Sequence, residues 1–235
     1  MKSWFKKHST NKKHEDSNTY WQLDNVYERN KESPYTFYKP SKAVTDKLKA
    51  GDLVKLVFFS DSDTAGYKGE RMWVEITDRN KENFVGKLDN EPYHLKGLKL
   101  GQILHFGTEH ICDTETEHIC DTEYEDDEVA KMDYYFNTLV TVSNDVLERN
   151  EFNFLLKDKP NEPNDSGWVI FSGYEEDEFT SNPNNFQIVA LGVALNVDDS
   201  ILAFINESPL CAYERNEFGK FDRIHDYDWE TYLSE

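Results

Sequence analysis

The sequence has few of the residues that carry redox chemistry, and it has no long apolar run. It holds three cysteines, and two of them, Cys112 and Cys120, fall in one duplicated segment, so a disulfide framework is not expected. No apolar stretch reaches the length of a membrane span, and the N-terminal residues lack the apolar segment of a secretion signal. We therefore expect a cytoplasmic protein that does not enter a membrane.

Basic residues are also scarce. The 235 residues include 26 Lys and Arg against 46 Asp and Glu, which gives a formal net charge of −20. Such a surface repels nucleic-acid phosphates and anionic membranes, and it attracts basic partners over long range. Residues 1–19 are the exception, because they hold five lysines. We interpret them as a flexible basic arm that aids solubility rather than a nucleic-acid contact, so neither nucleic acid nor membrane is an expected partner.

Recognisable catalytic motifs are missing. The chain has no Gly-rich phosphate loop, nucleophile elbow or metalloprotease signature. The paired acids of "YEEDE" (174–178) and "DYDWE" (226–230) are chemically suited to general acid–base catalysis, yet no His, Ser or Cys motif accompanies them. We expect no catalytic residue and a protein that is not an enzyme. A small hydrolase-like enzyme of unknown substrate is the alternative.

One segment does look like a metal motif. The unit TEHICDTE occurs twice in succession over residues 108–123 and places His110, Cys112, His118 and Cys120 within eleven positions. Zinc binds these ligand types. Eight extended residues span about 27 Å, so the four side chains converge only if the chain folds back between the copies. We favour a tandem duplication in an exposed loop, with no metal and no cofactor. A zinc-stabilised adaptor is the alternative.

The apolar residues that are present indicate an α+β protein of two small domains. Short helices are expected over 24–31 and, with Ser41 as N-cap, over 41–49. Short β-branched and aromatic runs follow, at 52–60, 71–78, 83–88 and 101–106, separated by turn residues. They predict a β-rich N-terminal domain over 20–107, built as a small twisted sheet or barrel.

A block of ten acidic residues without Lys or Arg fills 108–128 and predicts a loop or linker over 108–130. The second, acidic α+β domain is expected over 131–235. Its strands are placed at 134–143, 151–157, 168–173, 186–191 and 211–215, with 151–157 as the hairpin partner of 134–143, and a helix is expected to begin at 198. The side chains expected in the two cores are Met72, Trp73, Trp168 and Phe171.

Two sets of motifs resemble known families. The first set resembles domain-of-unknown-function family 2314 over roughly 33–111, and it consists of Arg71-Met72-Trp73-Val74, then Gly86-x-Leu88-Asp89-Asn90-x-Pro92, then Gly101 with Leu104. The second set resembles the immunity protein 33 family (domain-of-unknown-function family 2185) over roughly 138–221. It consists of Asp165-Ser166-Gly167-Trp168, Ser172-Gly173 with the acidic run that follows, Asp199-Ser200-Ile201 and Ala212-Tyr213-Glu214-Arg215.

The second resemblance implies a role in bacterial polymorphic toxin systems, in which such proteins protect the producing cell from a toxin. It implies no catalytic residue set. Combined with the charge, it leads us to expect a non-enzymatic immunity protein that sequesters a cognate, basic protein toxin. Recognition residues concentrate in loops, and clustered carboxylates need cationic partners before they can be buried. The expected partner-binding residues are therefore Glu175, Glu176, Asp177, Glu178, Asp198 and Asp199.

Overall fold

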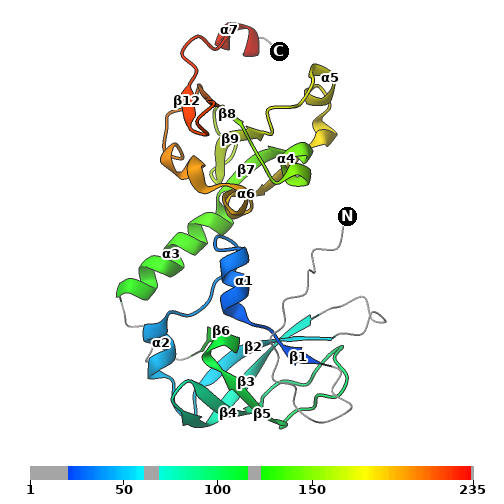
Figure 1. Ribbon diagram of the computed structural model, residues 1–235, viewed down its shortest axis with the longest axis vertical. Helices are drawn as coiled ribbons and strands as arrows, with labels where there is room; N and C mark the ends of the chain where they lie inside the picture. The colour runs from blue at the N-terminus through cyan, green and yellow to red at the C-terminus, as the bar shows by residue number, and fades with distance from the viewer. Residues whose placement is uncertain (1–20, 61–68, 116–122, 234–235) are drawn as a thin grey trace. The chain divides into compact units, whose positions relative to one another are not determined.

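The structure is a computed structural model that describes residues 21–60, 69–115 and 123–233, without the side chains of 123–126 (Figure 1). It divides into two compact units. The first holds the described residues within 1–26 and 40–116, and the second holds those within 27–39 and 117–235. Helices and strands are both well represented, and the α+β class expected from the sequence is confirmed. None of the described helices is long and apolar enough to cross a membrane.

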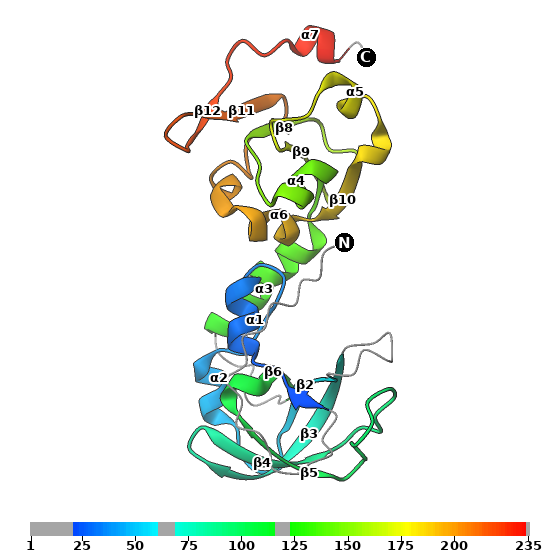
Figure 2. The same ribbon diagram turned by 45° about the vertical axis from the view of Figure 1, so that its right-hand side comes forward.

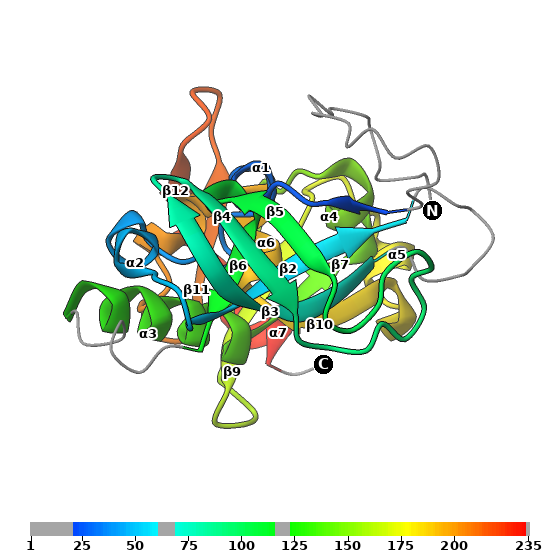
Figure 3. The same cartoon turned by 90° about the horizontal axis from the view of Figure 1, so that it is seen from below.

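The first unit is an antiparallel sheet that curls into a nearly closed barrel (Figure 3). Its strands pair in the order β1-β2-β3-β4-β5, and β6 returns to pair with β2. The strands are β1 (Gln22–Leu23), β2 (Leu53–Phe59), β3 (Gly69–Asn80), β4 (Asn83–Leu88), β5 (Ile103–Gly107) and β6 (Ile111–Thr114). A short 3-10 turn, η1 (Thr108–His110), leads from β5 directly into β6. The last strands therefore bring the chain back to the free edge of β2.

The alternation of apolar residues along the strands determines which side chains fill the interior of the barrel. Along β2 the side chains of Val54, Leu56 and Phe58 are fully buried, and along β3 those of Met72 and Val74 are buried. Successive side chains of a strand point to opposite faces, so these residues share the inner face. The burial expected for Met72 is confirmed.

The burial expected for Trp73 is wrong. Trp73 follows Met72 in β3 and is only partly buried, because its position in the strand alternation puts it on the outer face. There it carries the Lys55 ammonium 4.1 Å above its ring centre, and Lys55 also bonds Asp113 at 2.7 Å. A tryptophan in a strand run is therefore not a sufficient sign of the core.

Helix α2 (Lys42–Lys47) begins as expected, because Ser41 Oγ accepts the backbone N–H of Val44 at 3.2 Å. The helix ends two residues before the predicted Lys49. Gly51 follows in the left-handed region with φ of 94°, a conformation that favours glycine.

The first copy of the duplicated unit is not the exposed loop that the sequence indicated. Residues 108–114 form η1 and β6, and Ile111 and Cys112 are 0% and 6% exposed. Ile111 lies opposite Leu56 of β2, so its apolar side chain completes the barrel interior, while the acidic Asp113 bonds Lys55 at the surface. Residues 116–122, which hold most of the second copy, lie outside the described residues.

The acidic linker also ends earlier than predicted. A 15-residue helix, α3 (Glu123–Asn137), occupies positions where the sequence predicted partly a loop and partly a strand. The segment contains neither Gly nor Pro, so nothing in it interrupts a helix once packing favours one. The following strand, β7, therefore begins only at Leu139.

The second unit is built on an open six-stranded sheet in the order β10-β7-β9-β8-β11-β12. Figure 2 shows β12 and β11 on one side of this unit and β10 on the other. Its strands are β7 (Leu139–Ser143), β8 (Phe154–Lys157), β9 (Asp165–Phe171), β10 (Phe186–Ala190), β11 (Cys211–Arg215) and β12 (Phe221–Arg223). The expected hairpin between the first two of these strands is wrong. β7 pairs in parallel with β9, and β8 pairs antiparallel with β9 and β11, because helix α4 (Asn144–Arg149) carries the chain past β9 before β8 begins.

Helix α4, helix α6 (Leu191–Val197) and the 3-10 helix η3 (Asp199–Ala203) pack on the face of this sheet that carries Trp168. The other short helices are α5 (Asp177–Thr180), η2 (Pro183–Asn185) and α7 (Trp229–Tyr232), and Phe179 of α5 packs on Phe186 at the opposite face. The core includes Trp168, which is 0% exposed, as predicted, whereas Phe171 is only partly buried because it lies on the opposite face of β9. The helix expected to begin at 198 is the 3-10 helix η3, and Asp198 caps it by accepting the N–H of Ser200 at 2.8 Å.

A segment from early in the chain completes the second unit. Helix α1 (Val26–Glu32) leads into residues 33–39, where Tyr35 N–H donates to Asn196 Oδ1 at 3.1 Å and Thr36 Oγ1 accepts Asn196 Nδ2 at 2.7 Å. A β-carbon on Gly192 would lie 2.3 Å from the carbonyl oxygen of Tyr35, so only glycine allows the backbone of α6 to approach this segment.

Candidate partner-binding surface

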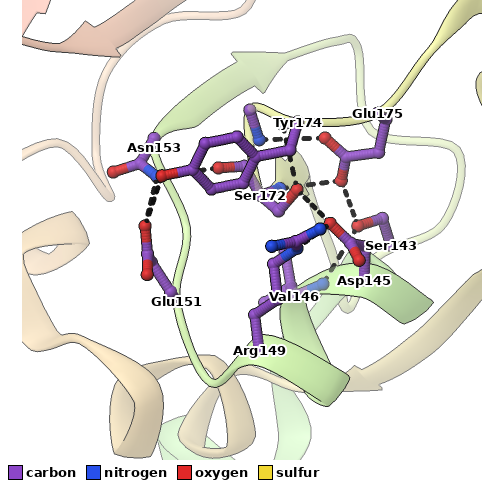
Figure 4. A network of polar contacts seen from close by, with 10 residues as sticks. Ser143, Asp145, Val146, Arg149, Glu151, Asn153, Ser172, Tyr174 and Glu175 are labelled. Carbon is purple, nitrogen blue, oxygen red and sulfur yellow. Dashed lines mark hydrogen bonds and ion pairs between the residues drawn. The ribbon is translucent and has the colours of Figure 1, made fainter.

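The turn that follows β9 is fixed by the carboxylate of Glu175 (Figure 4). This carboxylate accepts the backbone N–H groups of Ser172 and Gly173 at 2.7 and 2.9 Å, and it also accepts the hydroxyl of Ser143. Ser143 is the N-cap of α4, because its Oγ accepts the N–H of Val146 at 3.3 Å. One carboxylate thus joins the end of β9 to the start of α4.

A second set of bonds ties the same turn to the side of α4. The buried hydroxyl of Ser172 donates to Asp145 Oδ2 at 2.6 Å and accepts the N–H of Tyr174 at 3.1 Å. Asp145 in turn accepts Arg149 Nε at 2.5 Å, and the guanidinium carbon of Arg149 lies 4.8 Å from the ring centre of Tyr174. The aromatic ring is held against the helix by a cation–π contact and by the backbone beneath it.

The far end of Tyr174 is held as well. Its hydroxyl donates to Glu151 Oε1 at 2.9 Å, and Asn153 Nδ2 donates to the same oxygen at 2.8 Å and to the carbonyl of Ser172 at 2.9 Å. The side chains that meet here come from α4, from the segment before β8 and from the turn after β9 (Figure 4). Networks of this kind restrict the conformations of every member.

The carboxylates inside this network are held in their charged form. The hydrogen bond from Ser172, together with Arg149, lowers the pKa of Asp145 below its ordinary value. Burial raises the pKa of Glu175, but the hydrogen bonds from Ser143 and from the Ser172 N–H outweigh it, so the pKa of Glu175 is lowered overall. Both groups are therefore anionic at neutral pH, and the hydrogen bonds to them are charge-assisted.

Beside the network lies an open depression of about 430 Å³. Its sides are acidic, aromatic and amide groups from α4, from the turn after β9 and from the α5–η2 segment. The residues that line it are Asp145, Arg149, Tyr174, Glu175, Glu176, Glu178, Phe179, Asn182 and Asn185. The depression can accept a side chain that combines an apolar stem with a positive charge, since it offers both aromatic surface and carboxylates.

The structure separates the four acidic residues of the 175–178 run. Glu175 is used inside the network, whereas Glu176, Asp177 and Glu178 are exposed around the start of α5. Within the described residues, the side chains of these three form no hydrogen bond or ion pair. They remain available to a partner.

The second predicted pair lies elsewhere. Asp198 accepts Arg215 Nη2 at 2.6 Å, and Asp199 accepts the Tyr35 hydroxyl at 2.6 Å. In both Figure 1 and Figure 2, η3 and α5 occupy opposite sides of the second unit. The six predicted residues therefore do not form one surface.

Sequence reasoning missed Asp145, Arg149 and Tyr174. Two local signals pointed to the first two: Ser143 precedes "NDVLER" as an N-cap does, and Asp145 and Arg149 stand four residues apart, the spacing of a helical ion pair. Nothing in the sequence indicates that this helix meets the turn at 172–175. That contact depends on the parallel pairing of β7 with β9.

The segments considered for metal binding or catalysis have structural roles where they are described. His110 Nδ1 accepts the N–H of Gly107 at 2.9 Å, and burial lowers the pKa of His110. Burial also raises the pKa of the Cys112 thiol to about 11. Asp228 of the "DYDWE" segment caps α7. Within residues 21–60, 69–115 and 123–233, no three His, Cys, Asp or Glu residues are grouped to hold a metal ion.

Two family models match this chain, and one of them covers the residues of this surface. Residues 140–225 match the family model described as "Immunity protein Imm33 domain", and residues 23–134 match the one described as "Uncharacterized protein conserved in bacteria (DUF2314)". No curated protein and no solved structure matches the chain significantly. Both resemblances expected from the motifs are confirmed. The chain thus joins a segment similar to the DUF2314 family to one similar to the Imm33 immunity domain, and the network and depression lie within the latter, which supports a role in toxin immunity.

Proposed function

We propose that this protein is a non-enzymatic bacterial immunity protein that acts in the cytoplasm and neutralises a protein toxin by binding it. The contact surface is the depression together with the exposed carboxylates of Glu176, Asp177 and Glu178, called the α5 acidic surface below. The observation that carries the proposal is the placement of these exposed acids beside a fixed network within the segment that matches the immunity domain.

Rigidity is the first physical argument. Binding loses affinity when loops must be ordered, and the turn at 172–175 is already fixed by hydrogen bonds to Glu175 and Ser172. The proposal therefore changes the role of Glu175, from a partner contact to a residue that holds the surface in shape. Asp198 and Asp199 receive similar structural roles, because they bond Arg215 and Tyr35.

Charge is the second argument. From residue 151 onward the chain holds 18 acidic and five basic residues, a net charge of −13. A basic toxin would be steered toward such a surface, and its Lys or Arg side chains could enter the depression between Tyr174, Phe179 and the carboxylates. The attraction weakens with salt because the Debye length is about 8 Å at physiological ionic strength. Protection would follow if the bound surface includes the toxin's active face.

The test is to read the genes that flank this chain's gene and to co-express the chain with a toxin encoded there. The variant Glu176→Gln/Asp177→Asn/Glu178→Gln removes three charges from the α5 acidic surface. Its matched control, Glu162→Gln/Glu217→Gln/Glu230→Gln, removes three charges from other exposed positions of the second unit. We expect the first variant to lose protection and to associate with the toxin about tenfold or more slowly at low salt, whereas the control keeps most of both.

Two outcomes would contradict the proposal. If both variants fold, protect equally and show the same dependence of association rate on salt, the α5 acidic surface is not the contact. If the unmodified protein neither binds nor neutralises the adjacent toxin, the immunity function itself is wrong.

A further inference from the structure

The open sheet of the second unit ends in an unpaired edge strand. β10 is one of the two end strands of the sheet, and among the described strands it pairs only with β7. An edge strand presents backbone N–H and C=O groups that can pair with another chain. The other features of β10 determine which groups those are.

The backbone groups of Ile188 point to the free side. In an antiparallel pair, alternate residues exchange hydrogen bonds with the partner strand, and the residues between them face away from it. Val189 of β10 lies opposite Val140 of β7. Two residues farther along β10, Leu191 N–H donates to Thr138 O at 2.7 Å, so this position bonds toward β7. Because bonded positions alternate, Val189 and Gln187, two and four residues before Leu191, also bond β7. The backbone N–H and C=O of Ile188, which lies between them, therefore face away from β7. No described strand lies on that side.

The side chain of Ile188 is also uncovered. It is 72% exposed, although isoleucine is among the residues most often buried in proteins. Two positions earlier on the same face, the Phe186 ring packs against those of Phe171 and Phe179, with centroids 5.6 and 6.4 Å apart. Ile188 therefore extends an apolar strip that begins with these rings and ends in solvent.

The edge strand and the depression form a continuous surface. Asn185 and Phe179 line the depression; Asn185 directly precedes β10 and donates through Nδ2 to the carbonyl of Phe179 at 2.9 Å. Farther along, Gln187 Nε2 donates to Asn144 Oδ1 at 2.6 Å and fastens β10 to α4. A partner segment lying along β10 would thus reach the acidic side chains of α5 without a break.

We infer that β10 receives an extended segment of the toxin as an added strand, with an apolar residue opposite Ile188 and a Lys or Arg two positions away, on the side of Phe186. This inference rests on the proposed function and specifies the partner's chemistry. Residues two apart share a face of a strand, so the apolar residue would cover Ile188 while the basic one reaches the α5 acidic surface. A second copy of this chain is a poorer occupant, because each copy carries a formal net charge of −20.

Amide hydrogen exchange on the full chain tests the inference directly, with the C-terminal domain of the toxin encoded by the adjacent gene as the probe. On binding, the amide of Ile188 should exchange at least about tenfold more slowly, because it gains a hydrogen-bond acceptor. The amides of Gln187 and Val189 are bonded to β7 beforehand and serve as internal references. A complex that forms without protecting Ile188 would overturn the added strand.

A pair of variants separates backbone from side chain. Ile188→Pro removes the outward N–H without removing a bond to β7, a position where edge strands accept proline, and should weaken binding about tenfold. Ile188→Thr keeps the N–H and the branched β-carbon and should bind more tightly than the proline variant. Equal binding by Ile188→Pro, Ile188→Thr and the unmodified protein would overturn the inference, and so would dimers held through β10 in the absence of toxin.

The remaining outcomes distinguish the inference from the proposed function. If the Glu176→Gln/Asp177→Asn/Glu178→Gln variant fails to bind while the Ile188 amide is unprotected in the unmodified complex, the acidic surface stands and the added strand is wrong. If the unmodified protein does not bind the toxin at all, both are wrong. If the proline variant does not fold, the exchange of the Ile188 amide in the unmodified protein decides whether the added strand forms.

Discussion

The sheet of the first unit is nearly closed, whereas the sheet of the second unit stays open. In the first unit β6 returns to β2, so the exposed edge of β2 is covered by β1 at one end and by β6 at the other. In the second unit the sheet stays open, and β10 ends it with the backbone of Ile188 directed away from β7. Closing a sheet removes the edges at which other chains can pair, whereas an open sheet keeps two end strands, which here are β10 and β12. An open edge of this kind supports the proposal that the second unit binds the partner.

Replacing one tryptophan in each unit tests this difference with the largest expected effect. Trp168→Ala should lower the free energy of unfolding by about 3–5 kcal/mol, because it removes a fully buried side chain whose Nε1 donates to the carbonyl of Ile205. Trp73→Ala should cost only about 1 kcal/mol, since it removes a partly exposed ring and its contact with Lys55. Urea unfolding followed by circular dichroism measures both. Equal losses would show that the barrel depends on its outer face as much as the open sheet depends on its core.

Replacing one glycine in each unit tests the same difference with a smaller expected effect. Gly192→Ala should destabilise the second unit by about 1–3 kcal/mol, because the new methyl group would meet the Tyr35 carbonyl on packed backbone. Gly107→Ala in the first unit is the matched control. There the three atoms nearest to the new methyl group all belong to the side chain of Glu109, which can move, so the effect should stay within about 0.5 kcal/mol. Thermal unfolding of the two variants gives the difference, and no loss in Gly192→Ala would mean that residues 33–39 do not pack closely on α6.

Lowering the pH should reduce the free energy of unfolding of the second unit by protonating carboxylates of the network at its surface. This is the smallest of the expected effects. The pKa values of Asp145 and Glu175 are lowered in the folded protein, so their stabilisation is fully present above the ordinary carboxyl pKa, near about 4. It is lost as the pH falls from there through the folded values. We expect Glu175→Gln to flatten the decline in stability below about pH 4, measured by urea unfolding at a series of pH values. A decline as steep as in the unmodified protein would show that Glu175 does not contribute to it.

Local sequence patterns were enough to predict much of the fold. Strands β2 to β5 of the barrel, the Ser41 cap and the burial of Trp168 all depend on neighbouring residues, on alternation or on capping chemistry. The failures concern pairings between distant segments. The strand formed by Ile111–Thr114 exists because β2 has a free edge there, and the parallel β7–β9 pair brings Asp145 to Ser172 across 27 positions. Neither is visible to a local pattern.

The acidic run shows the same limit at the candidate site. Charge and loop composition indicated Glu175 to Glu178 as one group, and three of its members are exposed as that prediction requires. Composition cannot tell which carboxylate is hydrogen-bonded by the protein's own N–H groups. It is Glu175, because Ser172 and Gly173 form the turn beneath it and Ser143 caps the helix beside it.

The contact between Tyr35 and Asn196 has a consequence for how this protein is made and how its gene can be rearranged. The two residues are 161 positions apart, so the ribosome releases the segment that carries Tyr35 long before the surface of α6 that receives it. Until α6 has been synthesised, residues 33–39 lack the surface on which they pack in the folded protein, so they cannot yet adopt that packed arrangement. A recombination event that transferred residues 140–225 alone would leave Gly192 and Asn196 uncovered. The compact unit that such an event would have to transfer is therefore larger than the stretch that the Imm33 family model matches, and it is split in two along the gene.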